Sequence, residues 1–479
     1  MKLPGGRNAL LIGALSLVTA GAVVWSVTGS SGSPGAAPGT PAVTTSASGQ
    51  QSAPAVTGAP VVAAPPVLGP LPSDAPQPSQ AGLSTALEAL LRQHELGPHV
   101  GAAVVDVATG ALLFGQDGNA SFTPASTTKL LTAAAALARL GPDYRIETKV
   151  VAGSTGQIIL VGGGDPTLST APPAGFLPAP ASMPELARST AAALKAKKVT
   201  SIRLGFDTTL FVGPRTAPTW PASYVSSGIV APVTALSVDE GRVGPIIEGT
   251  GSRVSDPPVS AARSFARLLT ADGIKVVGVP AAVTAGSSAA TLASVRSPQL
   301  SDLVGWMLSM SDNDLAEAVA HLTGKAAGDT ADFAGGARAV LSEAEALGLP
   351  TTGLALYDGS GLTPATTAAP ADLAGVLSAA ARSDQAALRS LLTSLSVSGF
   401  TGTLEGRFKD PATQLAAGLV RAKTGTLSTV GALAGTTVDA AGRVLAFAFL
   451  ADRVPAGGTL DARAALDRVA ARLVACGCR

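Results

Sequence analysis

A serine and a lysine three residues apart are the first pair in this sequence that could do chemistry. Ser126 and Lys129 begin an apolar, alanine-rich run, 129–140, which we predict to be a buried helix. Residues three apart share a helix face, so the hydroxyl and the amine would lie side by side. Burial would lower the pKa of the lysine, and the neutral amine could then take the serine proton. The positive end of the helix dipole would favour the resulting alkoxide.

A second segment, Ser311-Asp312-Asn313, lies between two predicted helices. The hydroxyl of Ser311 could pass a proton to a leaving amine, and the carboxamide of Asn313 could bind a substrate amide. The same residues are also typical of an ordinary helix cap, because Ser and Asp are preferred N-cap residues. By itself this segment therefore leaves both interpretations open.

A third segment, Lys423-Thr424-Gly425-Thr426, enters a predicted apolar strand. It combines a cation, two hydroxyls and a glycine that allows a close approach of the backbone. Taken alone, it is more typical of an exposed turn that carries a cation. A glycine-rich loop with Asp358 is expected to border a site of this kind.

The elements that must position these segments are both helices and strands. Runs at 100–106 and 111–114, separated by Thr-Gly, predict a β-hairpin ahead of the serine. Between 145 and 290, short β-like runs punctuated by Gly and Pro predict an inserted, mainly β module with one helix, 260–272. Outside that module the apolar periodicity predicts six helices besides 129–140, and two paired strands. The helices are expected at 84–95, 300–310, 314–323, 332–347, 370–381 and 461–474, and the strands at 432–437 and 444–450.

Composition excludes several classes of function. The 479 residues exceed one ordinary domain, and 33 Lys and Arg against 32 Asp and Glu give a net charge of +1. Such a chain has no basic field for nucleic acid. Its three histidines, His94, His99 and His321, show neither metal-site spacing nor an acidic partner pattern, so we expect no metal, no cofactor and no histidine-based triad. Cys476 and Cys478 are expected to lie in an inert tail, with a local or intermolecular disulfide as the alternative.

The N-terminal segment indicates export. Lys2 and Arg7 precede an uncharged apolar run, 9–27, long enough for a bilayer, and positive charge on the short side places the remainder outside. We expect 1–28 to be a signal-anchor that holds an extracytoplasmic enzyme at the cell membrane. Cleavage near Ala22, which would release a secreted protein, is the alternative. Residues 29–81, rich in Ser, Pro, Gly and Ala, are predicted to form a disordered tether with a reach of roughly 40 Å.

Together, S-x-x-K, S-D-N and K-T-G in this order are the signature of penicillin-binding proteins and class A β-lactamases. The chain resembles the low-molecular-mass class C penicillin-binding proteins, the D-Ala-D-Ala carboxypeptidase/endopeptidase family, which carries extra domains between the first two motifs. One departure is the segment 238–242, which lacks an asparagine after its acidic residue. The resemblance also covers the stretches Gly162–Pro166, Ala235–Asp239, Ser311–Glu317, Asp358–Leu362 and Ala422–Leu427.

The resemblance implies an α+β fold of the β-lactamase/transpeptidase type, with an antiparallel sheet flanked by helices and a helical subdomain. Residues 82–144 and 291–475 would form this penicillin-binding domain, and 145–290 the insertion. The family's roles, carried onto matching positions, make Ser126 the acylated nucleophile and Lys129 its general base.

The remaining roles implied by the resemblance fall on the second and third segments. Ser311 would relay protons, Asn313 would position the acyl donor, and Lys423 would supply positive charge. Thr424, Gly425 and Thr426 would bind the substrate's terminal carboxylate. The backbone N–H groups of Ser126 and Thr426 would form the oxyanion hole.

The implied activity is that of a serine-type D-Ala-D-Ala carboxypeptidase or D,D-endopeptidase that acts on peptidoglycan stem peptides and is inhibited by β-lactams. Two alternatives stay open. One is a β-lactamase or esterase of the same fold, and the other is a non-catalytic module that binds the cell wall.

Overall fold

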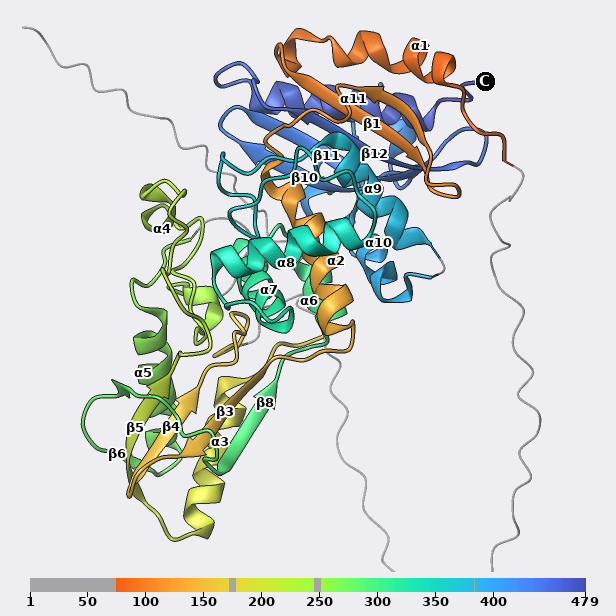
Figure 1. The fold of residues 1–479 in the computed structure, drawn as a ribbon. Coiled ribbons are helices and arrows are strands. Elements are labelled where there is room, and N and C mark those ends of the chain that lie inside the picture. Colours follow the sequence, from red (N-terminus) through yellow and green to blue (C-terminus); the bar gives the residue numbers. More distant parts are fainter. Residues whose placement is uncertain (1–74, 172–177, 245–250, 383) are drawn as a thin grey trace, which may run out of the picture. The chain divides into compact units, whose positions relative to one another are not determined.

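A computed structural model describes residues 75–171, 178–244, 251–382 and 384–479 (Figure 1). The predicted signal-anchor, 1–28, and the tether up to residue 74 lie outside the described residues. None of the helices in the described part of the chain combines the length and apolar character that a bilayer crossing requires.

Six strands form an antiparallel sheet in the order β2, β1, β12, β11, β10, β9. Residues from the two ends of the described chain meet in it, because β1 pairs with β12 from Val100 opposite Ala451 to Asp106 opposite Leu445. The strands are β1 (Val100–Asp106), β2 (Leu112–Gln116), β9 (Ser396–Val397), β10 (Arg421–Leu427), β11 (Val430–Val438) and β12 (Val444–Ala451). The sheet therefore brings the strand of the third segment into one framework with the hairpin that precedes Ser126.

Helices cover both faces of this sheet (Figure 1). On one face, α1 (Gln80–Leu91) and α11 (Thr459–Val474) share a core with strand residues such as Val104 and Phe447. The other face packs against α9 (Pro370–Ala381), which shares a core with α2 (Lys129–Leu140). Every residue of α2 from Lys129 to Leu137 is buried. Around α2 also lie α6 (Leu300–Ser309), α7 (Asn313–Ala326), α8 (Phe333–Ala346) and α10 (Arg389–Thr393).

A second, mixed sheet lies in the part of the chain between α2 and α6. Its strands follow the order β6, β5, β4, β3, β8, and β7 also pairs with β5. The strands are β3 (Glu147–Ala152), β4 (Gln157–Val161), β5 (Ser201–Asp207), β6 (Lys275–Val276), β7 (Ala281–Ala282) and β8 (Thr291–Arg296). The helices α3 (Met183–Ala196) and α5 (Pro257–Ala271) share one core with this sheet, and the short helix α4 (Ser223–Ser226) completes the region.

The helix α3 was missed by the sequence analysis, which predicted one helix in this region. Its first turn carries a readable signal, because the N-cap Ser182 accepts a hydrogen bond from the backbone N–H of Glu185. Ser followed three residues later by Glu is the pattern of a capping box. The short β-like runs on either side of this segment favoured a mainly β interpretation instead.

Three boundary predictions need correction. The first helix begins at Gln80 and ends at Leu91, four residues earlier at each end than the predicted 84–95. The tether also ends before residue 81: Ala75 is buried, and its carbonyl accepts a hydrogen bond from Arg443. Residues 75–81 therefore belong to the folded part, because their contacts with the domain offset the cost of ordering them.

The C-terminal cysteines are likewise more ordered than the inert tail we expected. Cys476 and Cys478 form a disulfide with their Cα atoms 5.0 Å apart. The carbonyl of Cys478 accepts a hydrogen bond from the backbone N–H of Ser79, the residue that caps α1. The end of the chain is thus held against the first helix, a contact that no local sequence pattern could indicate.

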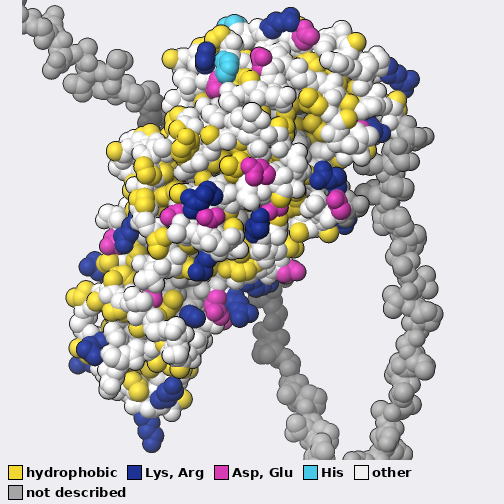
Figure 2. Space-filling model, in the orientation of Figure 1, with side chains coloured by type: hydrophobic (Ala, Val, Ile, Leu, Met, Phe, Trp, Pro, Cys, Tyr) yellow, Lys and Arg dark blue, Asp and Glu magenta, His cyan; other side chains and the backbone are white. Residues whose placement is uncertain are grey.

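Charged side chains of both signs are interspersed on the face of the molecule that Figure 2 shows. This agrees with the net charge of +1. No single-sign field of the kind that collects nucleic acid covers that face.

The buried ion pair between Arg407 and Asp467 of α11 gives the first prediction. The guanidinium makes two hydrogen bonds to the carboxylate, at 2.5 and 3.0 Å, and both side chains are less than a tenth exposed. Replacing Arg407 by Ala leaves the Asp467 charge buried and unpaired, so we expect a loss of about 3 kcal/mol in the free energy of unfolding.

Chemical denaturation measures this loss. The matched control is Arg92→Ala, which removes an exposed pair with Glu88 and should cost less than about 0.5 kcal/mol. Equal losses in the two variants would contradict the argument from burial.

Candidate active site

The turn that carries Ser126 is a short 3-10 helix, Ala125–Thr128, which leads directly into α2. The hydroxyls of Thr127 and Thr128 donate hydrogen bonds to the carbonyls three residues earlier and so fix the turn. Ala125 adopts a left-handed backbone conformation (φ 48°), which costs on the order of 1–3 kcal/mol for a residue other than glycine. Such strain concentrates at functional sites, and here it lies immediately before Ser126.

Lys129, the first residue of α2, is fully buried and meets three acceptors. Its Nζ lies 3.0 Å from Ser126 Oγ, 2.8 Å from Asn313 Oδ1 and 2.8 Å from the carbonyl oxygen of Ser360. Burial lowers the pKa of Lys129 to about 8, and the charge of Glu317 opposes that shift. The amine can therefore be neutral near physiological pH while it remains in contact with the serine hydroxyl.

The second segment lies at the start of α7. Asp312 is the N-cap, and Asn313 is the first residue of the helix. The amide nitrogen of Asn313 donates to the carbonyl of Ile229 at 3.0 Å, which turns its Oδ1 toward Lys129. Ser311 has a left-handed backbone conformation (φ 59°) and occupies the last position before the cap. The segment is therefore both a helix cap and part of the site.

Lys423 of β10 joins the third segment to the second. Its Nζ donates to Ser311 Oγ at 2.9 Å and to the carbonyl of Thr424 at 2.8 Å. The side chain is fully buried. Burial lowers the pKa of Lys423 well below its usual value, and the nearby charge of Lys129 lowers it further. The two lysines therefore disfavour each other's protonation within one site.

The rest of the third segment differs from residue to residue. Gly425 is buried, and a Cβ there would lie 2.6 Å from the carbonyl oxygen of Pro124, so glycine permits β10 to pack against the serine turn. The hydroxyl of Thr424 donates to that of Thr403 at 3.0 Å. Thr426 is exposed. Gly425 thus acts through packing, while the two threonines remain available to a ligand.

The structure brings every candidate residue to one place. Ser126, Lys129 and Asn313 are joined by direct hydrogen bonds, and Ser311 and Lys423 by another. Sequence reasoning missed the carbonyl of Ile229 and the hydroxyl of Thr403. It named the glycine-rich loop as a border of the site, and did not find that this loop offers a carbonyl to the lysine. Backbone carbonyls carry no residue-type signal, so only the fold could reveal them.

The histidines lie apart from these contacts. His321 is buried against Phe211 and Phe333, and burial lowers its pKa to about 4. His99 pairs with Asp452 at 2.5 Å, a carboxylate partner that the sequence pattern did not indicate, because Asp452 is distant in the chain.

One group of carboxylates among the described residues is close enough to hold a metal: Glu240, Asp312 and Asp314. Two arginines offset part of its charge, since Arg242 lies 2.9 Å from Glu240 and Arg253 lies 2.7 Å from Asp314. Burial and the neighbouring Asp312 raise the pKa of Glu240 well above its usual value. The cluster joins the segment around residue 240 to the start of α7. Its chemistry is that of an ion-pair network that supports the second segment.

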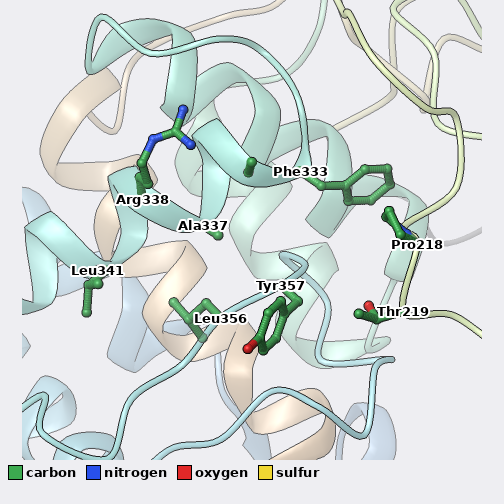
Figure 3. Close-up of a pocket in the computed structure, with 9 residues that line it drawn as sticks. Pro218, Thr219, Phe333, Ala337, Arg338, Leu341, Leu356 and Tyr357 are labelled. Atoms are coloured by element: carbon green, nitrogen blue, oxygen red, sulfur yellow. The ribbon is translucent and has the colours of Figure 1, made fainter.

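A mostly apolar pocket of about 430 Å³ lies on the other side of the glycine-rich loop. Figure 3 shows it between α8, which contributes Phe333 and Ala337, and the loop residues Leu356 and Tyr357. Thr219 also lines it. None of the three segments contributes to its lining, so this pocket is separate from the candidate active site.

The α+β fold and the convergence of S-x-x-K, S-D-N and K-T-G at one site define the class of active-site serine enzymes that recognise penicillin. Within this class, the chain belongs to the D-Ala-D-Ala carboxypeptidase 3 (S13) family, which it matches over residues 83–251 and 247–473. This confirms the resemblance to the low-molecular-mass class C penicillin-binding proteins, and with it a serine-type D-Ala-D-Ala carboxypeptidase.

Curated relatives and solved structures agree with this assignment. The chain is 37% identical over 407 residues to Carboxypeptidase Rv3627c of Mycobacterium tuberculosis, covering 83% of this chain and 85% of that protein. It is 38% identical over 403 residues to Carboxypeptidase DacB of Mycolicibacterium smegmatis, with the same two shares. Its fold is similar to penicillin binding protein 4 (dacB) from Haemophilus influenzae, with a TM-score of 0.65 at 22% identity, covering 82% of this chain and 98% of that one.

The close packing of Gly425 gives the second prediction. A methyl group there would meet the carbonyl of Pro124 and displace β10 from the serine turn. We expect Gly425→Ala to lower the rate of acylation by penicillin at least roughly tenfold, because small displacements of reacting groups are costly.

The acylation rate of each variant is measured by stopped-flow spectroscopy or on gels. Gly406→Ala is the matched control, because a Cβ there meets nothing within 4 Å. An acylation rate in Gly425→Ala equal to that of the control would show that the approach of β10 to the turn is not needed.

Proposed function

We propose that Ser126 is the nucleophile with which this enzyme cleaves the D-Ala–D-Ala bond of peptidoglycan stem peptides. The observation that carries the proposal is the hydrogen bond between Ser126 Oγ and the buried amine of Lys129. A neutral amine in that position removes the hydroxyl proton as the oxygen attacks the carbonyl of the penultimate D-Ala. The C–O bond forms, and the carbonyl oxygen becomes an oxyanion.

The oxyanion accepts hydrogen bonds from the backbone N–H groups of Ser126 and Thr426. This placement is supported by Gly425, which holds β10 against the serine turn.

The edge of β10 beside the site is open to a substrate. The strand β9 pairs only with Arg421 and Ala422 of β10. In the described part of the chain no strand pairs with that edge beyond Ala422. The substrate backbone can therefore align along this edge as an added strand.

Collapse of the tetrahedral intermediate breaks the C–N bond, and the leaving amine needs a proton. Ser311 delivers it, because its hydroxyl is hydrogen-bonded to Lys423 Nζ and that amine can replace the proton. Asn313 holds the acyl donor through its carboxamide, whose orientation Ile229 fixes. Water then hydrolyses the ester at Ser126 and restores the free enzyme.

The terminal carboxylate of the substrate binds at the third segment. Lys423 provides positive charge, and Thr424 and Thr426 provide hydroxyl donors. Thr424 shares one hydrogen bond with Thr403, so this pair keeps one O–H free for a carboxylate oxygen. The same groups would hold the carboxylate of a penicillin, which would acylate Ser126 in the place of the peptide.

The alternatives differ in the fate of the acyl-enzyme. A β-lactamase or esterase of this fold would hydrolyse the penicilloyl ester quickly. A wall-binding module without catalysis would form no adduct at all. The contacts among Ser126, Lys129 and Asn313 favour catalysis, because a binding module has no need for a buried amine beside a serine hydroxyl. Carboxypeptidase and endopeptidase action share this chemistry and differ only in whether the second D-Ala of the substrate carries a further peptide.

The third prediction is a persistent penicilloyl adduct on Ser126. Full-length protein incubated with labelled penicillin and digested should show the label on the peptide that contains Ser126. Ser126→Ala should remain folded and unlabelled, because the substitution removes only one hydroxyl. We expect the adduct to last for many minutes, as a peptidase active site has no need to hydrolyse it rapidly.

Mass spectrometry locates the label and follows its loss. Label on another residue, or none, would refute the assignment of Ser126, and loss within seconds would favour a β-lactamase. Ser121→Ala, at a hydroxyl before the same turn that donates to Gly353, controls for nonspecific effects of removing a serine.

We also propose that 1–28 anchors the enzyme in the cell membrane, with the catalytic part outside. The proposal is supported by Lys2 and Arg7 ahead of the apolar run, and by a substrate that lies outside the membrane.

The fourth prediction concerns the anchor. Expressed in bacteria, the full chain should be recovered in the membrane fraction with its N-terminal segment intact, and protease added to spheroplasts should degrade its catalytic part. N-terminal mass analysis distinguishes this from processing. A chain that begins soon after Ala22 and is found in the medium would contradict anchoring.

A further inference from the structure

We propose that Glu317 is a positioning residue: its carboxylate holds the loop Asp358–Gly361 where the carbonyl of Ser360 can orient the amine of Lys129. The inference rests on the proposed function, because it requires Lys129 to be the general base. It concerns a residue that neither touches the substrate nor belongs to the three segments. Glu317 lies on α7 and acts on the site through another part of the chain.

The contacts form a continuous chain from Glu317 to the base. Glu317 Oε2 accepts from the backbone N–H of Gly359 at 2.9 Å, and Oε1 accepts from that of Ser360 at 2.8 Å. The carbonyl of Ser360 then accepts from Lys129 Nζ at 2.8 Å. Glu317 is fully buried, as are Lys129 and Ser360. A carboxylate that binds two successive N–H groups fixes the peptide groups on both sides of Gly359. The next peptide group carries the Ser360 carbonyl that contacts the lysine.

The loop is clamped from the opposite helix as well. The hydroxyl of Thr132, one turn after Lys129 in α2, donates to the carbonyl of Gly359 at 2.7 Å. A Cβ at Gly359 would lie 2.5 Å from the Cβ of Ala320 and 2.7 Å from the carbonyl of Ala316, so the loop rests directly on α7. Little freedom remains for the backbone between the two helices. The position of the Ser360 carbonyl therefore depends on the carboxylate beneath it.

The register of α7 couples this contact to the second segment. Asn313 and Glu317 are four residues apart and share one helix face. The first contacts Lys129 directly, and the second contacts it through Ser360. One helix thus places two of the three acceptors that surround the amine, and a shift of α7 would move both together.

Glu317 also acts on Lys129 through its charge. The groups whose charges act on Lys129 are Glu317, Asp312 and Asp314 from α7 and Asp358 from the loop, and Lys423 is the cation beside it. Among the carboxylates Glu317 has the largest effect, raising the pKa of Lys129 against the lowering caused by burial. Burial also raises the pKa of Glu317 to about 8, while its N–H donors lower it. The two groups titrate in the same range and influence one another.

Removing the charge of Glu317 has a definite sign. The base works as a neutral amine, so the acylation rate of the wild type should rise with pH and level off above about 8. In Glu317→Gln the carboxylate that most strongly opposes deprotonation is lost, and the pKa of Lys129 falls. The rising limb should then move to lower pH by roughly one unit. The maximal rate should fall roughly tenfold, because the amide puts an NH₂ donor against a backbone N–H and displaces the loop.

The fifth prediction compares three variants of the full-length enzyme by the pH dependence of acylation with a chromogenic β-lactam. Glu317→Gln should show both changes. Glu317→Asp keeps the charge but shortens the side chain, so its limb should stay within about 0.3 pH unit of the wild type while its plateau falls several-fold. Asp372→Asn is the matched control: Asp372 is also buried and accepts from two backbone N–H groups, of Ala369 and Thr351, at the start of α9. It should lose stability with no shift of the limb.

The outcomes separate this proposal from the proposed function. A wild-type enzyme that is acylated at Ser126, combined with an unshifted limb in Glu317→Gln, would overturn the role of Glu317 and leave the nucleophile in place. If Glu317→Gln does not fold, Glu317→Asp decides, and a plateau equal to that of the wild type would overturn the proposal. A shift of the limb in Asp372→Asn equal to that in Glu317→Gln would also overturn it, because a general loss of stability would then explain both.

Discussion

Burial of the Lys129 amine is the constraint on which the rest of this structure depends. An ammonium group removed from water is costly unless hydrogen bonds surround it, and here three acceptors do so: a serine hydroxyl, an asparagine carboxamide and a backbone carbonyl. Each acceptor comes from a different part of the chain. The cost of desolvation is what lowers the pKa to about 8, so the arrangement that satisfies the amine also makes it a usable base.

The fold supplies these acceptors by packing helices around α2. Four consecutive alanines, 133–136, lie within its buried length, and their small side chains let neighbouring helices such as α7 approach closely. The start of α7 then places Asn313 beside Lys129, and β10 brings Lys423 to Ser311 on the other side. The region between α2 and α6 also takes part, because Ile229 orients Asn313 and Trp220 donates to Asp358 at 2.7 Å. This region is therefore more than an appendage to the catalytic fold, since removing it would release two of the groups that order the site.

Two of the left-handed residues other than glycine lie at the same points. Ala125 and Ser311 both have left-handed backbones, and each lies directly beside or within a catalytic segment. Residues other than glycine hold such conformations only where surrounding contacts determine them. Around Ala125 those contacts are the threonine hydroxyls of the turn and the approach of Gly425, and around Ser311 they are the α7 cap and the amine of Lys423. These contacts keep the hydroxyls of Ser126 and Ser311 in place before any substrate arrives.

The amino-acid sequence by itself determined the residue types that carry the chemistry, since S-x-x-K depends on helix spacing and the other two segments on local strand and turn chemistry. It also indicated most of the helices and several of the strands, because runs of apolar residues mark segments that the fold buries. Tertiary structure alone decided which backbone groups complete the site. The carbonyls of Ile229 and Ser360 are available in any residue type, and their positions result from contacts across more than eighty residues of chain. The ordered residues 75–81 and the contacts of Glu317 were decided in the same way, by long-range packing that local patterns do not encode.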